Sequence, residues 1–462
     1  MDEADEPDAK ADVDRHFSGR NHSAVLARLC LVGTLIAAGC SPAWAQTRYD
    51  FRFFGSGFAI GLQTLVPPVG ADDLRLREAR DYERGGSIER AAERYVDVLS
   101  ASGFSPSVAL EYASFLERRG RIDTAEQVLT ALSRDHPQNL NVLSALAQIE
   151  LTRRDWVKAQ SVAEQIRGAN DTSGMADRVL GEALIGQGKF DEGIAVFQRA
   201  ADASPSAIQP KLALVTALAR AQKTDRAVDI LKSVLQANPD NAEAHVLMGS
   251  IQLAAGAADQ ALQYFKLAVD KQPKNVAGYQ ALVGLYVRQR KFDEAMDVIR
   301  SGLRVEPDST TMHLALAGVF EQTGRYEDAI GEYERMLDKQ PDSLIAANNL
   351  ASLLSDRRGD KASLARARRL VAILRESPVP QFMDTLGWVS LRSGDTATAV
   401  ELLDKAAAAL PNNAVVRYHL GMSYGANGQA GKAAEQLKAA LALTPDKELD
   451  GKIRDALKIV AK

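Results

Sequence analysis

Apolar residues recur along most of the chain at intervals of three and four, which marks one buried face on each of a long series of helices. The segments AEAHVLMGSIQLAA (242–255) and ADQALQYFKLAVD (258–270) are two neighbouring examples. Gly256 lies between them, where a residue free to adopt positive φ can end the first helix. Pro273 follows the second segment and prevents its continuation. The pattern predicts two helices joined by a tight turn.

This two-helix unit repeats every 34 residues. Its closing prolines are Pro205, Pro239, Pro273, Pro307 and Pro341, all at that spacing. Such a fixed period indicates an array of stacked units rather than several globular domains. The units are predicted at 72–105, 106–139, 140–173, 174–207, 208–241, 242–275, 276–309, 310–343, 344–379, 380–413 and 414–447.

The end of the array departs from the strict period. The ninth unit is two residues longer, and we place its extra length in the turn around RRGDKAS (357–363). Residues 448–462, ELDGKIRDALKIVAK, form a last amphipathic segment. It is predicted to be a capping helix that covers the open end of the final unit.

Small residues occupy two fixed positions of the unit, which predicts close helix contacts where a larger side chain would overpack the core. One position holds Ala91, Ala125, Ala159, Gly193, Ala227, Ala261, Ala295, Ala329, Ala399 and Ala433. The other holds Gly181, Gly249, Ala317, Ala351, Gly387 and Gly421. Larger apolar residues fill a complementary position, at Phe197, Leu231, Phe265, Ile299, Tyr333, Leu403 and Leu437.

The period, these positions and the closing proline together resemble the tetratricopeptide repeat, over nearly everything after residue 71. The resemblance implies an all-α fold: an α-solenoid of about eleven helix-turn-helix repeats in a right-handed superhelix. Some units depart from the pattern. Asp171 replaces the closing proline of repeat 3, and repeat 5 has Val215 and Gln222 where glycine is usual. We therefore separate weaker repeats (72–173) from strong ones (174–447).

Residues 1–45 are predicted to be an export signal region. The apolar stretch LARLCLVGTLIAAGC (26–40) is too short to span a bilayer as a stable helix, and Arg20 precedes it. SPAWAQ favours cleavage between Ala45 and Gln46. A second interpretation takes AAGC as a bacterial lipobox with Cys40 as a lipidated first residue, although Ala37 stands where a larger aliphatic residue is usual. A third leaves the stretch as an uncleaved apolar helix.

Residues 46–71 precede the first repeat and are predicted to be a linker or a short N-terminal segment. TRYDFRFF (47–54) alternates aromatic and other residues, as a short strand does, and VPPVG (66–70) breaks regular structure. The glycines of GSGFAIG (55–61) lack the spacing of a phosphate-binding loop.

Composition and charge narrow the possible functions. The formal net charge is only −4, which argues against a nucleic-acid-binding protein with a basic stripe. The two cysteines, Cys30 and Cys40, both lie in the apolar N-terminal stretch, so the repeats contain neither disulfides nor thiolate metal sites. No nucleophile elbow, zinc-protease or Walker motif is present. His245 and His313 occupy one packing position two units apart. We predict a non-enzyme without cofactor or metal.

The resemblance also implies that the first helix of each unit lines a concave groove. The residue positions that face this groove are the second, fifth, sixth, ninth, twelfth and thirteenth of the unit. In repeats 9–11 they include Asn348, Asn349, Ser352, Asp384, Trp388, Arg392, Tyr418, His419 and Met422. Polar groups mixed with aromatic side chains suit recognition of a peptide or a polymer. The alternative is that Trp388 and Tyr418 pack between units.

A basic cluster in repeat 9 suggests a second surface. It consists of Arg357, Arg358, Lys361, Arg366, Arg368 and Arg369, with Arg375 nearby. Such a cluster could bind an anionic polymer or an acidic protein face. It is more often a solvated helix surface, and Asp356, Asp360 and Glu376 lie close in sequence.

The sequence therefore predicts an exported scaffold that presents a long concave surface to protein partners in the bacterial envelope. A weaker resemblance sharpens this: NNLASLL, MDTLGWVSLRSGD and VRYHLGMSYGANGQ look like the end of exported bacterial repeat proteins of exopolysaccharide and exosortase systems. The expected location is the periplasm, or the outer membrane if Cys40 is lipidated. Direct binding of a polysaccharide by repeats 9–11 is the alternative function.

Overall fold

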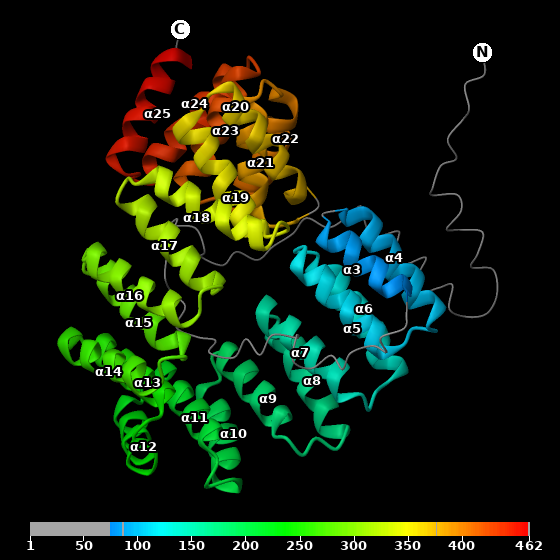
Figure 1. Ribbon diagram of the computed structural model, residues 1–462, viewed down its shortest axis with the longest axis vertical. Coiled ribbons are helices and arrows are strands. Elements are labelled where there is room, and N and C mark those ends of the chain that lie inside the picture. The colour runs from blue at the N-terminus through cyan, green and yellow to red at the C-terminus, as the bar shows by residue number, and fades with distance from the viewer. Residues whose placement is uncertain (1–73, 86, 376, 461–462) are drawn as a thin grey trace.

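The computed structural model describes residues 74–85, 87–375 and 377–460, and across these residues it contains 23 α-helices and no strand. The prediction of an all-α repeat solenoid is confirmed. Figure 1 shows the helices stacked side by side along a strongly curved path from α3 to α25.

The helices form eleven pairs, numbered here as repeats 1–11. The first helices of the pairs are α3 (Leu74–Arg84), α5 (Pro106–Arg118), α7 (Leu140–Arg153), α9 (Met175–Gly186), α11 (Ile208–Arg220), α13 (Ala242–Ala254), α15 (Val276–Arg288), α17 (Thr310–Gln322), α19 (Leu344–Leu353), α21 (Pro380–Arg392) and α23 (Ala414–Ala426). The second helices are α4 (Ile88–Ala101), α6 (Ile122–Asp135), α8 (Trp156–Gly168), α10 (Phe190–Ala203), α12 (Thr224–Ala237), α14 (Ala258–Lys271), α16 (Phe292–Val305), α18 (Tyr326–Lys339), α20 (Lys361–Val371), α22 (Thr396–Ala409) and α24 (Ala430–Ala442).

Local sequence signals begin and end these helices. The side chain of Asn241 accepts a hydrogen bond from the N–H of Ala244 and so caps the start of α13. Gly188 ends α9 with φ +79°, and the N–H of Lys189 then bonds the carbonyl of Leu184 at 2.9 Å. This left-handed turn satisfies carbonyls at the helix end and directs the chain into α10.

The two helices of a repeat interlock through the small residues that the sequence singled out. A Cβ atom added to Gly181 would lie 2.5 Å from the ring of Phe197, and one added to Gly249 would lie 2.5 Å from the ring of Phe265. Both aromatic rings are buried. In repeat 5 the same position holds Val215, which is also fully buried. The prediction of close helix contacts at these glycines is confirmed.

The curvature of the array follows from which helices touch. First helices of successive repeats contact one another, as in α13 with α15, α19 with α21, and α21 with α23. Comparable contacts between successive second helices are absent from the described part of the chain. The first helices therefore line the concave wall. After repeat 11, α25 (Lys447–Val460) buries Ile453 beside Leu437 and covers the last pair.

Repeat 9 is irregular, and here the structure differs from the prediction. A π-helical turn, η2 (Leu354–Arg358), extends α19, and a 3-10 turn, η3 (Ala372–Leu374), follows α20. Helix α20 begins 35 residues after α18, and α21 begins 36 residues after α19. The turn around RRGDKAS thus holds only one of the two extra residues. The other lies between α20 and α21, because the chain leaves α20 through η3 before α21 begins.

The curved path returns to its own beginning. Figure 1 shows repeats 1 and 2 beside repeats 9 and 10. At this meeting point the guanidinium of Arg119 lies 2.6 Å from the carboxylate of Asp342, although 223 residues separate the two in sequence. The array thus closes one turn on itself.

Candidate functional site

The predicted binding residues of repeats 9–11 come together on the concave wall around one aromatic cluster. The indole of Trp388 on α21 stacks on the imidazole of His419 on α23, and Tyr418 lies 5.9 Å from Trp388 between ring centroids. The guanidinium of Arg392 lies 5.7 Å from the centre of the Trp388 ring. Burial, and then the negative charge of Asp356, raise the pKa of Tyr418.

Two carboxylates hold this aromatic cluster in place. The indole N–H of Trp388 donates to Asp356 at 2.6 Å, from the π-helical turn of repeat 9. Nδ1 of His419 lies 2.9 Å from Oδ1 of Asp384. Each bond joins neighbouring repeats, so the cluster fixes the relative orientation of repeats 9, 10 and 11.

A second set of hydrogen bonds continues the polar surface towards repeat 8. The side chain of Asn348 donates to Asn349 at 3.0 Å, and Asn349 donates to the hydroxyl of Tyr333 at 3.1 Å. That hydroxyl in turn donates to Glu321 at 2.8 Å. Oδ1 of Asn348 is buried and has no hydrogen-bond partner among the residues that the structure describes.

The structure corrects part of the predicted contact surface. Trp388 and His419 are 6% and 4% exposed, so they pack between repeats and present little surface to a partner. Tyr418 and Met422 are half-buried, and Arg392 is exposed. Ile345, which is 50% exposed on α19, was not singled out from the sequence. Its place at the second position of the repeat was the signal that could have identified it.

Half of the basic cluster of repeat 9 is engaged in ion pairs. Arg357 forms an ion pair with Glu448 of α25 at 2.8 Å and lies over the ring of Tyr326. Arg358 pairs with Glu327 and Arg366 with Glu334, both on α18. The exposed cations left on α20 are Lys361, Arg368 and Arg369. Acidic residues distant in sequence thus pair with half of the cluster, which favours the alternative of a solvated helix surface.

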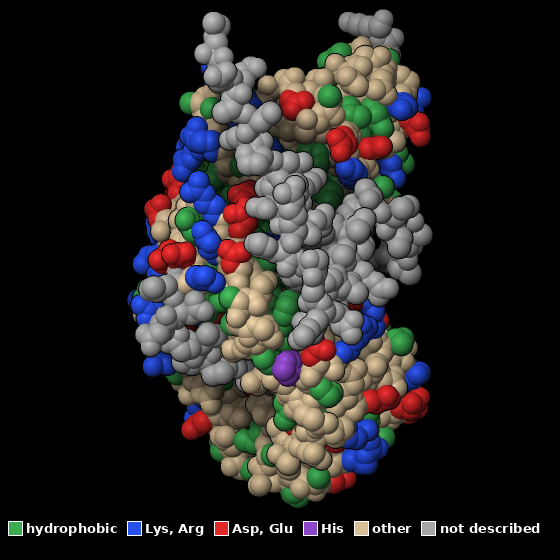
Figure 2. Space-filling view, turned by 90° about the vertical axis from the view of Figure 1, so that its right-hand side faces the viewer, with side chains coloured by type: hydrophobic (Ala, Val, Ile, Leu, Met, Phe, Trp, Pro, Cys, Tyr) green, Lys and Arg blue, Asp and Glu red, His purple; other side chains and the backbone are tan. Residues whose placement is uncertain are grey.

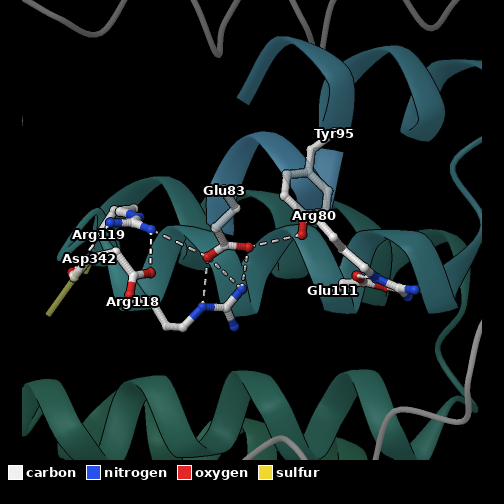
Figure 3. A network of polar contacts seen from close by, with 7 residues as sticks. All are labelled: Arg80, Glu83, Tyr95, Glu111, Arg118, Arg119 and Asp342. Atoms are coloured by element: carbon white, nitrogen blue, oxygen red, sulfur yellow. Dashed lines mark hydrogen bonds and ion pairs between the residues drawn. The ribbon is translucent and has the colours of Figure 1, made fainter. Parts of the chain in front are cut away.

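A second charged network lies in repeats 1 and 2 and was not predicted (Figure 3). The carboxylate of Glu83 accepts two hydrogen bonds from Arg118 at 2.9 Å and one from the hydroxyl of Tyr95 at 3.1 Å. Arg80 forms a two-fold pair with Glu111, with one contact at 2.7 Å. The four charged residues, Arg80, Glu83, Glu111 and Arg118, all occupy concave-wall positions of the repeat. Those positions were the sequence signal that could have identified the network.

Three further carboxyl groups on the concave wall have raised pKa values. Burial raises the pKa of Glu117 to about 7, against the opposing charge of Arg118. Burial also raises the pKa of Glu182, which Arg178 and Arg220 partly offset, and the pKa of Glu243. Desolvation of the charged form is the shared cause.

Cationic and anionic side chains are interspersed on the face of the molecule that Figure 2 shows. Within the described residues no three His, Cys, Asp or Glu side chains are grouped so as to hold a metal ion. No helix in the same residues is long and apolar enough to cross a membrane.

The predictions for the N-terminal region lie outside the described residues. They concern the export signal at 1–45 with its cleavage between Ala45 and Gln46, the lipidation of Cys40, and the segment 46–71. They remain predictions.

Comparison with known families identifies the class of protein. One tetratricopeptide repeat family model matches residues 184–251, 218–286 and 390–455, and a second matches 76–139, 144–208 and 281–343. These matches cover most of the chain, so the chain belongs to the tetratricopeptide repeat family. It is a repeat scaffold of the kind that binds protein partners. No curated protein matches the sequence.

Several solved structures are similar to this chain. A chain of the APC/C hetero-tetramer Cut9–Hcn1 is 13% identical with a TM-score of 0.44, and the alignment covers 84% of this chain and 96% of that one. Yeast Tom70 is 13% identical with a TM-score of 0.41, covering 84% and 95%. PilF of Pseudomonas aeruginosa is 16% identical with a TM-score of 0.38, covering 48% and 96%.

Proposed function

We propose that this protein is a non-catalytic scaffold whose concave wall in repeats 9–11 binds an extended segment of a protein partner. The observation that carries the proposal is the run of half-buried and exposed side chains on this wall, in which the amides of Asn348 and Asn349 are followed by Tyr418 and Arg392. A polypeptide in extended conformation presents N–H donors and carbonyl acceptors at regular intervals, which an asparagine side chain can pair with. Ile345 on the same helix, and Tyr418 and Met422 in repeat 11, add apolar area to the wall.

A peptide segment suits this wall better than an anionic polymer does. Amide and hydroxyl groups are prominent there, and three of the six cations of the basic cluster, Arg357, Arg358 and Arg366, are already engaged in ion pairs to neighbouring helices. Rigid aromatic side chains add contact area at low cost in conformational entropy. The partner is therefore expected to contribute backbone hydrogen bonds and one or two apolar side chains.

A capture experiment with matched variants tests the binding surface. The protein and the variants Tyr418→Ala and Asn348→Asp are used to capture envelope proteins, which are quantified by mass spectrometry. A partner of the concave wall is retained by wild type and lost from both variants. Lys405→Ala, on the exposed surface of α22, serves as the control and retains it. A partner bound equally by all four proteins would exclude this surface.

The alternative partner gives a different result in the same assay. Arg358→Glu combined with Arg369→Glu should leave a peptide partner bound. If that double variant abolishes binding, and if wild-type binding falls steeply with salt, the ligand is an anionic polymer.

We further propose that the scaffold acts in the bacterial envelope, within a surface-assembly or polysaccharide-export machinery. Support for export comes from the apolar stretch of residues 26–40, and support for the pathway comes only from the C-terminal resemblance described above. The intact mass of the purified protein tests export. A chain beginning at Gln46 and a diacylated chain beginning at Cys40 have different masses, whereas an unprocessed chain would contradict both.

A further inference from the structure

The contact between Arg119 and Asp342 is unusual for a repeat array. Arg119 follows the last turn of α5, and Asp342 lies in the turn between α18 and α19. Nη2 of Arg119 lies 2.6 Å from the Asp342 carboxylate, and Nη1 lies 3.4 Å from its carbonyl oxygen. A repeat normally contacts only its neighbours. This bond instead joins repeat 2 to the junction of repeats 8 and 9.

A second contact forms at the next residue. A Cβ atom on Gly120 would lie 2.6 Å from Oγ and 3.6 Å from Cβ of Ser377, and 3.8 Å from Val379. Both partners lie in the linker before α21, the segment that holds one of the extra residues of repeat 9. Matching turn glycines in other repeats have nothing within 4 Å: Gly188, Gly256, Gly324, Gly394 and Gly428. The turn of repeat 2 thus packs against the linker before α21, whereas the equivalent turns of these other repeats have no such contact.

Asp342 differs from its equivalents in the choice of partner. Asp240 pairs with Lys271 at 2.9 Å, and Asp308 pairs with Lys339 at 3.2 Å; in each case the lysine lies 31 residues further on. The residue 31 positions after Asp342 is Ile373. Because this local partner is missing, the Asp342 carboxylate is available to Arg119.

Arg119 is placed so that the bond to Asp342 can break. Its side chain is 4% exposed, and it also lies 3.5 Å from Glu83, which Arg118 and Tyr95 hold in position (Figure 3). If Asp342 withdraws, Glu83 still balances the buried guanidinium. Asp342, whose side chain is 28% exposed, becomes hydrated. Breaking a buried ion pair is usually costly because one charge is left buried and unpaired. Opening of this contact avoids that cost, because Arg119 keeps Glu83 as a partner.

We propose that Arg119 and Asp342 form an ionic latch that closes repeats 2–9 into a ring and that opens reversibly. The six repeat junctions between repeats 2 and 8 share the movement, so each needs to rotate only slightly. Closure restricts access to the concave wall from the side, and opening restores it. The proposal concerns the conformation of the free protein and does not depend on the partner proposed above.

Cross-linking tests whether the ring closes in solution. The 3.6 Å separation at Gly120 and Ser377 lies within the Cβ–Cβ range of a disulfide. In the full chain carrying Cys30→Ser and Cys40→Ser, Gly120→Cys with Ser377→Cys should form an intramolecular disulfide on mild oxidation. Gly256→Cys with Ser377→Cys is the matched control and should not. Failure of the first pair to cross-link would overturn the proposal.

Distance measurements test whether the latch opens. Nitroxide labels at the exposed positions Gln127 on α6 and Asp338 on α18 report the separation of the two ends. Asp342→Asn should add a population at longer distance, because it removes the charge that pairs with Arg119. Asp308→Asn, which removes the equivalent local pair, should not. An unchanged distance in Asp342→Asn would show a static ring and refute the latch.

Discussion

The indole ring of Trp388 stacks on the imidazole of His419 with 4.0 Å between ring centroids and 15° between ring planes. One residue belongs to repeat 10 and the other to repeat 11, and each is fixed by its own carboxylate, Asp356 or Asp384. The stack therefore joins three consecutive repeats at the concave wall.

Replacing Trp388 by alanine should destabilise the last three repeats. The change removes a buried indole and leaves Asp356 without that donor, and the loss of a large buried aromatic side chain typically costs about 3–5 kcal/mol. Hydrogen exchange should show the loss in repeats 9–11, while repeats 1–5 keep their protection, because each repeat is stabilised by its neighbours. Tyr418→Ala is the control for surface contact and should cost clearly less stability.

Adding a single methyl group at Gly249 should lower stability. Glycine to alanine inside a helix ordinarily gains about 0.5–1 kcal/mol. At Gly249 the new Cβ would lie 2.5 Å from Phe265, and overpacking of this kind costs about 1–3 kcal/mol. Gly284→Ala on α15 is the matched control, because nothing lies within 4 Å, and it should stabilise the protein. Chemical denaturation measures both. The same sign of effect in the two variants would disprove the packing argument.

The carboxyl group of Glu117 should make the protein less stable as pH rises from about 4.5 to 7. Its pKa is about 7 in the folded protein and 4.5 as an ordinary glutamate, so the folded state binds the proton more tightly in this range. Ionisation then costs the folded state up to about 3 kcal/mol. Glu117→Gln should therefore raise the melting temperature at pH 8 and leave it nearly unchanged at pH 4.

Glu150 should contribute to the same pH dependence of stability as Glu117. Burial, and then the charge of Glu126, raise its pKa to about 7 as well. Glu117→Gln should consequently remove only part of the pH dependence, and adding Glu150→Gln should remove more. A melting difference between Glu117→Gln and wild type that is equal at both pH values would contradict the raised pKa.

The last helix should be required for the stability of repeat 11. Ile453 on α25 is fully buried in the cluster with Leu437 and Ala440, so Ile453→Ala should cost about 2–5 kcal/mol. Ile459 on the same helix is 72% exposed, and Ile459→Ala should have little effect. Limited proteolysis near the C-terminus compares the two. Equal cleavage rates would mean that α25 does not cover the final pair.

The repeat architecture could be predicted from the sequence because its signals are local. The glycine-ended first helices, the prolines such as Pro273, and the facing positions of Gly249 and Phe265 all lie within one unit. The concave-wall residues followed from the position within the repeat. The burial of each side chain could not be predicted in the same way. Trp388 stands at a wall position, yet its ring packs against the next repeat and is buried there.

Features that depend on distant parts of the chain could not be predicted. The partners of Arg357 and Arg358 come from other repeats, so the sequence left open whether this cluster is free to bind an anion. Arg119 and Asp342 carry no sequence sign of their contact. Their meeting depends on small rotations accumulated over many junctions, and no single unit encodes that sum.

The bond between Arg119 and Asp342 also limits how this gene can change. An ordinary array tolerates duplication or loss of a unit, because every junction resembles the next. Here an inserted or deleted unit between the two residues would displace one end by a whole helix pair and separate Gly120 from Ser377. The copy number between them is therefore fixed by geometry.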